Sequence, residues 1–164
     1  MDDALASGPD NIRSAGYWIA STQSRCGSCA ELTRVVALAL PSGHETLDLD
    51  ASDGTLETWA CATLPAVLFA VYRLAAPVRR ELQRRSPAYR LTSVDGAEQW
   101  NNHCEHCGAP QDEEELHGEP DAAFMPASAD AGARIRIEAI AEPLLAGAAG
   151  YAPDPLFFPR ATVA

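Results

Sequence analysis

Cys104-Glu105-His106-Cys107-Gly108 is the most specific motif of the sequence, and it has a counterpart in Cys26-Gly27-Ser28-Cys29. Two thiolates separated by two residues can chelate one metal ion, and the glycine after the second motif allows a tight turn that aims backbone N–H groups at sulfur. In the first motif, small residues between the cysteines also permit close wrapping around an ion. Together the motifs predict a closed structural zinc site with four ligands, Cys26, Cys29, Cys104 and Cys107.

The spacing between the two motifs is unusual. They are separated by 74 residues, whereas common zinc-ribbon patterns have roughly 15 to 20. One bound Zn²⁺ would therefore hold together distant parts of a single domain. Two alternatives stay open, a redox role for the paired thiols and two unrelated cysteine pairs. The fifth cysteine, Cys61, lies in an apolar run and is interpreted as a core residue.

Histidines and carboxylates near the second motif are not expected to bind the metal. His103, His106 and His117 could replace a cysteine ligand, but four cysteines already complete the set. We expect His103 and His106 to be solvated or hydrogen-bonded neighbours of the motif, and His44 to be a loop residue. The acidic run 112–115 is interpreted as a solvated loop, because it lacks the spacing and glycine of a calcium loop. No catalytic residue is assigned, and enzymatic activity is not expected.

Composition indicates one globular domain. A chain of 164 residues with 47% hydrophobic content can bury a substantial core. We expect a loose polar tail at residues 1–14, a single zinc-binding domain at 15–158 and a short tail at 159–164. No secretory signal is visible, and the longest uncharged stretch, 59–72, is interrupted by proline and is shorter than the roughly 20 residues of a membrane-spanning helix. These features predict a cytoplasmic protein without a membrane segment.

Short strands dominate the predicted secondary structure. The fold class is predicted to be α+β, with mostly short antiparallel strands, one or two helices, a zinc-ribbon-like centre and a long insertion between the motifs. The run 65–72 could be a strand or a buried helix, and no element is predicted beyond Pro143. Strands are expected at 17–20, 33–40 and 134–140, a hairpin at 89–94 and 97–100 about Asp95-Gly96, and an amphipathic helix at 77–85.

The charge distribution bears on possible partners. A net charge of −11 and a pI near 4.6 oppose binding to a phosphate backbone, so nucleic acid is not expected as a partner. A local basic surface nevertheless remains, because half of the twelve cationic residues fall in one segment: Arg73, Arg79, Arg80, Arg84, Arg85 and Arg90. The absence of lysine and the abundance of alanine indicate a GC-rich bacterial genome.

Several of these segments resemble an uncharacterised group of bacterial zinc-binding proteins with paired Cys-x-x-Cys motifs. The resemblance implies cytoplasmic zinc ligation by the four matching cysteines and extends from about residue 15 to about residue 158. The acidic run 112–115 stands where that group has a less charged, aromatic-containing stretch. The matching segments are Tyr17-Trp18, Cys26-x-x-Cys29, Val35-Val36-Ala37-Leu38 and Trp100-x-Asn102-His103-Cys104-x-His106-Cys107-Gly108-Ala109-x-Gln111.

The predicted function is a non-enzymatic interaction or adaptor module with an unidentified protein partner, because a closed metal site stabilises a scaffold. One alternative is a thiol-disulfide or zinc-linked redox sensor, and another is nucleic-acid binding through the arginine-rich helix. Tyr17, Trp18 and Trp100 could form a binding surface, although aromatic residues beside a zinc site more often belong to the core. The sequence leaves the oligomeric state open.

Overall fold

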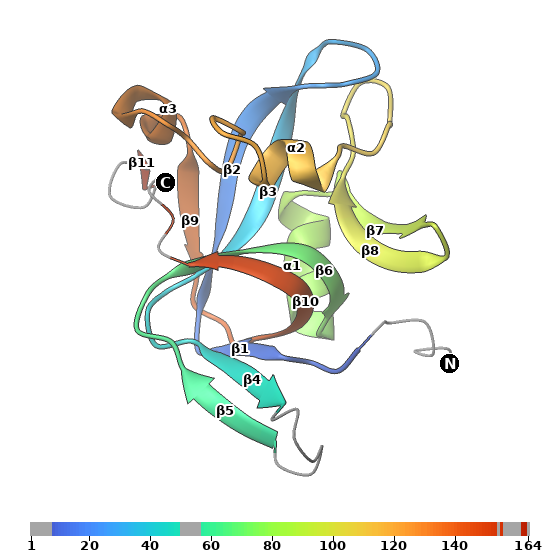
Figure 1. Cartoon of the computed structure of the whole chain (residues 1–164). Coiled ribbons are helices and arrows are strands. Elements are labelled where there is room, and N and C mark those ends of the chain that lie inside the picture. The colour runs from blue at the N-terminus through green and yellow to red at the C-terminus, as the bar shows by residue number, and fades with distance from the viewer. Residues whose placement is uncertain (1–7, 50–56, 154, 156–161, 164) are drawn as a thin grey trace.

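The computed structural model describes residues 8–49, 57–153, 155 and 162–163. Within these residues, nine strands form one sheet in the order β11-β9-β2-β3-β6-β10-β1-β4-β5, and two further strands form the separate hairpin β7-β8 (Figure 1). The strands are β1 (Ile12–Ser14), β2 (Tyr17–Arg25), β3 (Leu32–Leu40), β4 (Glu45–Leu49), β5 (Glu57–Cys61), β6 (Ala66–Leu74), β7 (Tyr89–Val94), β8 (Ala97–Asn102), β9 (Arg136–Ile140), β10 (Leu144–Pro153) and β11 (Thr162–Val163).

Three short helices complete the described structure, namely α1 (Ala76–Arg85), α2 (Glu113–His117) and α3 (Ala129–Ala133). Within the described residues, the strand pairs are antiparallel except the short parallel pair of β11 and β9. The predicted α+β class is therefore confirmed in its coarse form, with one helix more than the one or two expected.

The β2–β3 hairpin is the centre of the fold and carries the first cysteine motif in its connecting loop. Its register runs from Trp18 opposite Ala39 to Arg25 opposite Leu32. Side chains alternate between the two faces of a strand, and in β3 both faces are covered. Val36, Leu38 and Leu40 enter one apolar cluster, whereas Val35 and Ala37 enter a second. This double burial explains why the β3 sequence is an almost continuous apolar run.

The helix and hairpin that follow β6 form as the sequence predicts. Pro77 stands in the first turn of α1, and Val78 and Leu82, one turn apart, are its buried residues. The hairpin turns at Asp95 and Gly96, whose φ angles are both positive at 50° and 82°. Such angles are typical of the two-residue turn that matches the twist of antiparallel strands. The ambiguous run 65–72 is resolved as a strand, because β6 includes all of it except Pro65.

The predicted tail at residues 1–14 is wrong at its C-terminal end. Ile12 belongs to β1, lies between Ala146 of β10 and Thr46 of β4, and is only 2% exposed. One apolar residue in a polar segment produces no periodic pattern, so the sequence contains no local signal for this strand. Residues 1–7 lie outside the described part of the chain. In the segment predicted as a second tail, β11 pairs with β9.

The Ala- and Gly-rich segment beyond Pro143 forms the longest strand, β10. Its small residues are required by close packing against aromatic side chains of β6. A Cβ atom on Gly147 would lie 2.3 Å from Tyr72 Cε2, and one on Gly150 would lie 2.1 Å from Phe69 Cε2. The composition that obscured this strand therefore follows from the close approach of β6.

Cys61 corrects another expectation. It is exposed rather than a core cysteine, because β5 is the terminal strand of the sheet and pairs with β4 alone among the described strands. Its apolar neighbours in sequence do not determine on which side of an edge strand the thiol lies.

Candidate metal centre

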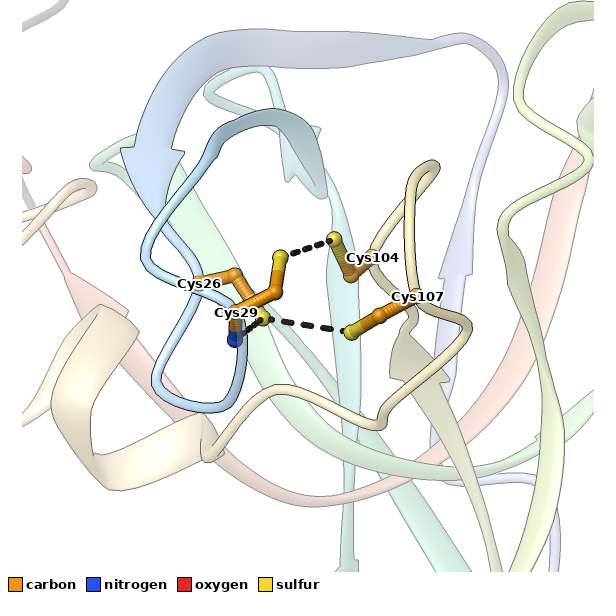
Figure 2. Close-up of side chains that lie close together, drawn as sticks. All are labelled: Cys26, Cys29, Cys104 and Cys107. Atoms are coloured by element: carbon orange, nitrogen blue, oxygen red, sulfur yellow. Dashed lines mark hydrogen bonds between the residues drawn. The ribbon is translucent and has the colours of Figure 1, made fainter.

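The structure brings the four predicted cysteines together. Their Sγ atoms all lie within 4.8 Å of one another. Between the two motifs, the Sγ atoms of Cys26 and Cys107 lie 3.7 Å apart, as do those of Cys29 and Cys104. Dashed lines mark both contacts in Figure 2. A disulfide has an S–S distance of about 2.0 Å, and all four residues are free thiols. The cluster therefore combines one half-site from the β2–β3 loop with one from the segment after β8.

The two cysteine loops repeat the same backbone geometry. We name residues 26–31 the first knuckle and residues 104–109 the second knuckle. In each, the leading cysteine N–H donates to the carbonyl five residues later, Glu31 or Ala109, and both distances are 2.8 Å. In each, the N–H four residues later donates back to the cysteine carbonyl, from Ala30 at 3.0 Å and from Gly108 at 2.9 Å. Two loops that differ in sequence thus present their sulfurs in the same way.

The fifth position of each knuckle has a positive φ angle, 64° at Ala30 and 77° at Gly108. Glycine adopts this left-handed conformation without a steric penalty, whereas a residue with a Cβ atom is strained there. The second knuckle has glycine at this position and the first has alanine. Both knuckles therefore need a left-handed residue at the fifth position, but only the second has the glycine that indicates it in the sequence.

Backbone N–H groups point at the leading sulfur of each knuckle. Cys26 Sγ accepts from Ser28 N at 3.3 Å and from Cys29 N at 3.5 Å, and Cys104 Sγ accepts from His106 N at 3.4 Å. A third donor to Cys26 is the side-chain amide of Gln111, which is buried and lies 3.4 Å from the sulfur. Donors of this kind stabilise negative charge on sulfur.

These donors shift the pKa values of the thiols. The backbone N–H groups of Cys29 and Ser28, together with Gln111, lower the pKa of Cys26 to about 6. The pKa of Cys104 is also lowered, chiefly by the backbone N–H of Cys107. The Glu31 N–H acts to lower the pKa of Cys29, but burial and the neighbouring sulfurs outweigh it and raise that pKa to about 12. Four adjacent thiols therefore cannot all ionise readily without a cation. Metal binding requires them as thiolates, so a bound cation would stabilise the ionised form.

The second knuckle is attached to the strand that follows the first. The Thr33 hydroxyl accepts from Glu105 N at 3.0 Å, and His106 Nε2 lies 2.9 Å from the Leu32 carbonyl oxygen. Asn102, the last residue of β8, is hydrogen-bonded to both backbone groups of Val36 in β3. Residues 74 positions apart in sequence are thereby fixed beside each other before any ion is considered.

The histidines lie outside the sulfur cluster, which consists of cysteines alone within the described residues. His106 is an exposed, hydrogen-bonded neighbour of the second knuckle, in agreement with the prediction. His103 is buried, with Nε2 2.8 Å from the Thr92 hydroxyl and Nδ1 3.0 Å from the Asn101 carbonyl. His44 follows a turn but is only 2% exposed, with Nδ1 2.8 Å from the Pro41 carbonyl. The expectation of a simple loop residue is therefore incomplete for His44.

The acidic run 112–115 is not a solvated loop. It begins α2, where the Asp112 carboxylate accepts from the N–H groups of Glu114 and Glu115. Glu113 points inward, is 15% exposed, and accepts from Ala70 N at 3.1 Å. Burial raises the pKa of Glu113 to about 7. A signal for this helix is present in sequence, because Asp followed three residues later by Glu is a capping pattern.

His117 lies one helical turn after Glu113, with Nε2 3.8 Å from Oε2 of that carboxyl. Burial lowers the pKa of His117 to about 4, and its ring stacks on Phe124 with centroids 5.1 Å apart. Its Nδ1 has no hydrogen-bond partner within the described structure. This pair was not found by sequence reasoning, since a carboxylate in an acidic run is ordinarily exposed.

The aromatic residues near the first motif belong to the core. Tyr17 and Trp100 are 2% and 6% exposed and lie in the first apolar cluster. Trp18 is partly buried and packs against the second cluster. The alternative of an aromatic binding surface made by all three is therefore not supported.

Comparisons with protein-family models, with curated proteins and with solved structures find no match for this chain. The resemblance to bacterial zinc-binding proteins thus stays a prediction from the quoted segments. In the described part of the chain, no helix has the length and apolar character needed to cross a membrane.

Proposed function

We propose that the sulfur cluster binds one Zn²⁺ ion as a structural site, with Cys26, Cys29, Cys104 and Cys107 as ligands. The observation that carries this proposal is the separation of the sulfurs. A zinc ion with Zn–S bonds of about 2.3 Å in tetrahedral geometry requires sulfur atoms about 3.8 Å apart. Two Sγ–Sγ distances between the knuckles, Cys26 to Cys107 and Cys29 to Cys104, are both 3.7 Å. An all-sulfur donor set also favours zinc over hard cations such as Mg²⁺ or Ca²⁺.

Residues around the cluster offset the negative charge of four thiolates. Four thiolates around Zn²⁺ carry a net charge of about −2, and the N–H groups directed at Cys26 and Cys104 offset part of it. The side-chain amide of Gln111 also donates to Cys26 Sγ, and a second hydrogen bond, to the Ala109 carbonyl at 2.9 Å, holds this amide in place. When bound, the ion supplies a crosslink between the knuckles and no open coordination position.

We further propose that the zinc-held fold is a non-enzymatic interaction or adaptor module that works in the cytoplasm, as the sequence resemblance implies. A four-sulfur site offers no ligand position for a substrate. His103 and His117 are buried, and their hydrogen bonds or ring contacts are with the protein itself. Substrate turnover that depends on either histidine would overturn the non-enzymatic part of this proposal.

Metal content measured on untagged protein tests the zinc site. Native mass spectrometry and elemental analysis are expected to find about one zinc per chain. Replacement of any of the four proposed ligands by Ser is expected to reduce bound zinc and destabilise the fold, because metal binding and folding are coupled. The matched control is Cys61→Ser, which removes an exposed thiol and should leave zinc and stability unchanged. A folded, metal-free protein that is insensitive to chelator would refute the site.

A second candidate function is a thiol-disulfide or zinc-linked redox sensor. The observation that favours it is the contact of Cys26, whose pKa is lowered to about 6, with the exposed Cys107. A thiolate beside an accessible thiol is the arrangement from which disulfides form. Mapping of the disulfides that form in the zinc-loaded chain, with the metal-free chain as the reference, distinguishes the two candidates.

A further inference from the structure

A groove of about 720 Å³ lies between α1 and the β7–β8 hairpin, on a part of the molecule away from the sulfur cluster. Figure 1 shows the hairpin projecting beside α1. Helix α1 contributes one wall and β7 the other. The residues that define its chemistry are Arg79, Arg80, Arg90, Tyr89, Leu91 and Trp100.

The groove concentrates positive charge on an acidic protein. Arg79, Arg80 and Arg90 form no ion pair within the described residues, and no carboxylate lines the groove. The neighbouring arginines of α1 differ, because Arg84 and Arg85 are both paired with Glu81. The net charge of the chain is −11. Three unpaired cations in one concave surface are therefore complementary to an anionic ligand and not to the protein's own carboxylates.

One apolar side chain of the groove, Leu91, is exposed beside these arginines. Tyr89 and Trp100 are buried with ring centroids 5.9 Å apart, whereas Leu91 is 42% exposed. Leu91 lies opposite Trp100 across the hairpin, so the two side chains share one face. A ligand that fits this surface carries apolar groups as well as negative charge.

Strand β7 also has an unpaired edge. Among the described strands it pairs with β8 alone. Hydrogen-bonded and non-hydrogen-bonded pairs alternate along an antiparallel hairpin, and the pair that flanks a two-residue turn, here Val94 and Ala97, is hydrogen-bonded. The Leu91–Trp100 pair is three positions further and is therefore of the other kind. The N–H and C=O of Leu91 consequently point away from β8, where an extended peptide could pair with them.

We propose that this groove binds an extended acidic segment of a partner protein, with carboxylates facing Arg79, Arg80 and Arg90 and apolar side chains over Leu91. The inference rests on the proposed interaction function and specifies the chemistry of the partner. A peptide fits better than a nucleic acid for two reasons. The overall charge repels a long polyanion, and the exposed Leu91 and free strand edge provide contacts that a phosphate backbone does not use.

The test uses the zinc-loaded chain of 164 residues and a fluorescently labelled peptide of about ten residues in which glutamate alternates with valine, long enough to add one strand. Fluorescence anisotropy is expected to show saturable binding that weakens as salt is added. The groove variant Arg79→Gln/Arg80→Gln/Arg90→Gln is expected to lower affinity at least about tenfold, since it removes three charged contacts. The same peptide with glutamine in place of glutamate should not bind.

The matched control is Arg84→Gln/Arg134→Gln/Arg136→Gln, which removes the same number of positive charges from outside the groove. It is expected to change affinity less than about twofold, because none of these three side chains lines the groove. Equal losses in both variants would show a non-specific charge effect and refute the groove. If a single-stranded oligonucleotide of matched charge binds more tightly, and this binding depends on the three groove arginines, the ligand of the groove is a nucleic acid and the peptide proposal is overturned.

Zinc content and near-ultraviolet circular dichroism are measured on every sample, so that the two proposals fail separately. A folded protein with one zinc that does not bind the glutamate peptide would overturn the groove proposal and leave the zinc site in place. Peptide binding by a folded, metal-free chain would overturn the structural zinc site and leave the groove proposal in place.

Discussion

Asn102 forms two hydrogen bonds with the backbone of Val36, so its side chain takes the place of a neighbouring strand. Its Oδ1 accepts from Val36 N at 2.8 Å, and its Nδ2 donates to the Val36 carbonyl at 2.9 Å. The pairing of β3 with β6 includes only Ala39 and Leu40, so Val36 has no strand partner on that side. Asn102 satisfies this buried position and fixes the chain two residues before Cys104.

The first prediction concerns this amide. Asn102→Ala leaves two buried backbone groups of Val36 unpaired and is expected to reduce the free energy of unfolding by about 2 to 4 kcal/mol. The second knuckle should also be held less firmly, so zinc should be lost at a lower chelator concentration. Denaturant unfolding and chelator competition measure the two effects.

Asn11 supplies the matched control, because it forms the same two bonds with Ala148 in β10, at 2.9 and 3.0 Å. Asn11→Ala is expected to destabilise the fold without changing zinc retention in the folded protein. If both variants shift the chelator midpoint equally after correction for stability, Asn102 has no special role in the metal site.

The second prediction uses the asymmetry between the knuckles. Ala30 has a φ angle of 64°, and replacing it by Gly removes strain that costs roughly 1 kcal/mol. Ala30→Gly should therefore be neutral or stabilising, whereas Gly108→Ala should destabilise by a similar amount. No atom outside its immediate neighbours lies within 4 Å of a Cβ at Gly108, so backbone strain alone would account for the effect. Thermal unfolding of the two zinc-loaded variants should show a lower midpoint for Gly108→Ala and an unchanged or higher midpoint for Ala30→Gly.

Features with local signals were predictable from sequence. The β2–β3 hairpin, helix α1 and the Asp95-Gly96 turn each depend on residues close together in the chain. The sulfur cluster was also predictable, because each Cys-x-x-Cys motif is a local half-site that needs a second one to complete a tetrahedral set.

Features that depend on distant contacts were not predictable. Strand β10 has glycine at positions 147 and 150, where Tyr72 and Phe69 of β6 occupy the space that a Cβ atom would take. Glu113 is drawn inward by the N–H of Ala70, a residue with a φ angle of 50° in β6. Neither contact has a signal near the residue concerned, and both become visible only when the strands are placed beside each other.

The third prediction is a pH dependence due to Glu113. Its folded pKa, about 7, is raised above the ordinary 4.5 by burial, so the native state binds this proton more tightly than the unfolded state. The corresponding stability is fully present below about pH 4.5 and is lost as the pH rises through 7. Glu113→Gln keeps an acceptor for Ala70 N but has no proton to lose. Between pH 5 and pH 8, the free energy of unfolding of the variant should rise relative to that of the wild type by about 2 to 3 kcal/mol.

The difference in free energy of unfolding between Glu113→Gln and the wild type isolates Glu113, because the buried His117 is present in both. The pKa of His117 is lowered to about 4, so its contribution is lost as the pH falls below about 6.5 and largely cancels in the comparison. Glu114→Gln, at an exposed position of the same helix, is the control and should show no such trend. Parallel stability curves for Glu113→Gln and wild type would mean that the carboxyl stays ionised in the fold.

The last prediction separates a structural zinc site from a redox site by the disulfides that form with and without zinc. Oxidised glutathione, which accepts the electrons and leaves as two reduced molecules, serves as the oxidant. The sulfurs in contact across the two knuckles are Cys26 with Cys107 and Cys29 with Cys104, and each pair needs to approach from 3.7 Å to about 2.0 Å. The metal-free chain is therefore expected to form these two crosslinks, identified by mass spectrometry of non-reduced peptides.

In the zinc-loaded chain the same treatment should leave all four ligands reduced, because thiolates bound to the ion are less available as nucleophiles. Exposed Cys61 is the internal reference, since it should be modified to the same extent with and without zinc. A reversible disulfide within one motif, Cys26 with Cys29, that forms in the zinc-loaded chain and releases the ion would contradict the structural assignment. That result would require the first knuckle to rearrange, because the N–H groups of Ser28 and Cys29 now hold Cys26 Sγ beside Cys107, and it would make redox sensing the better account of the site.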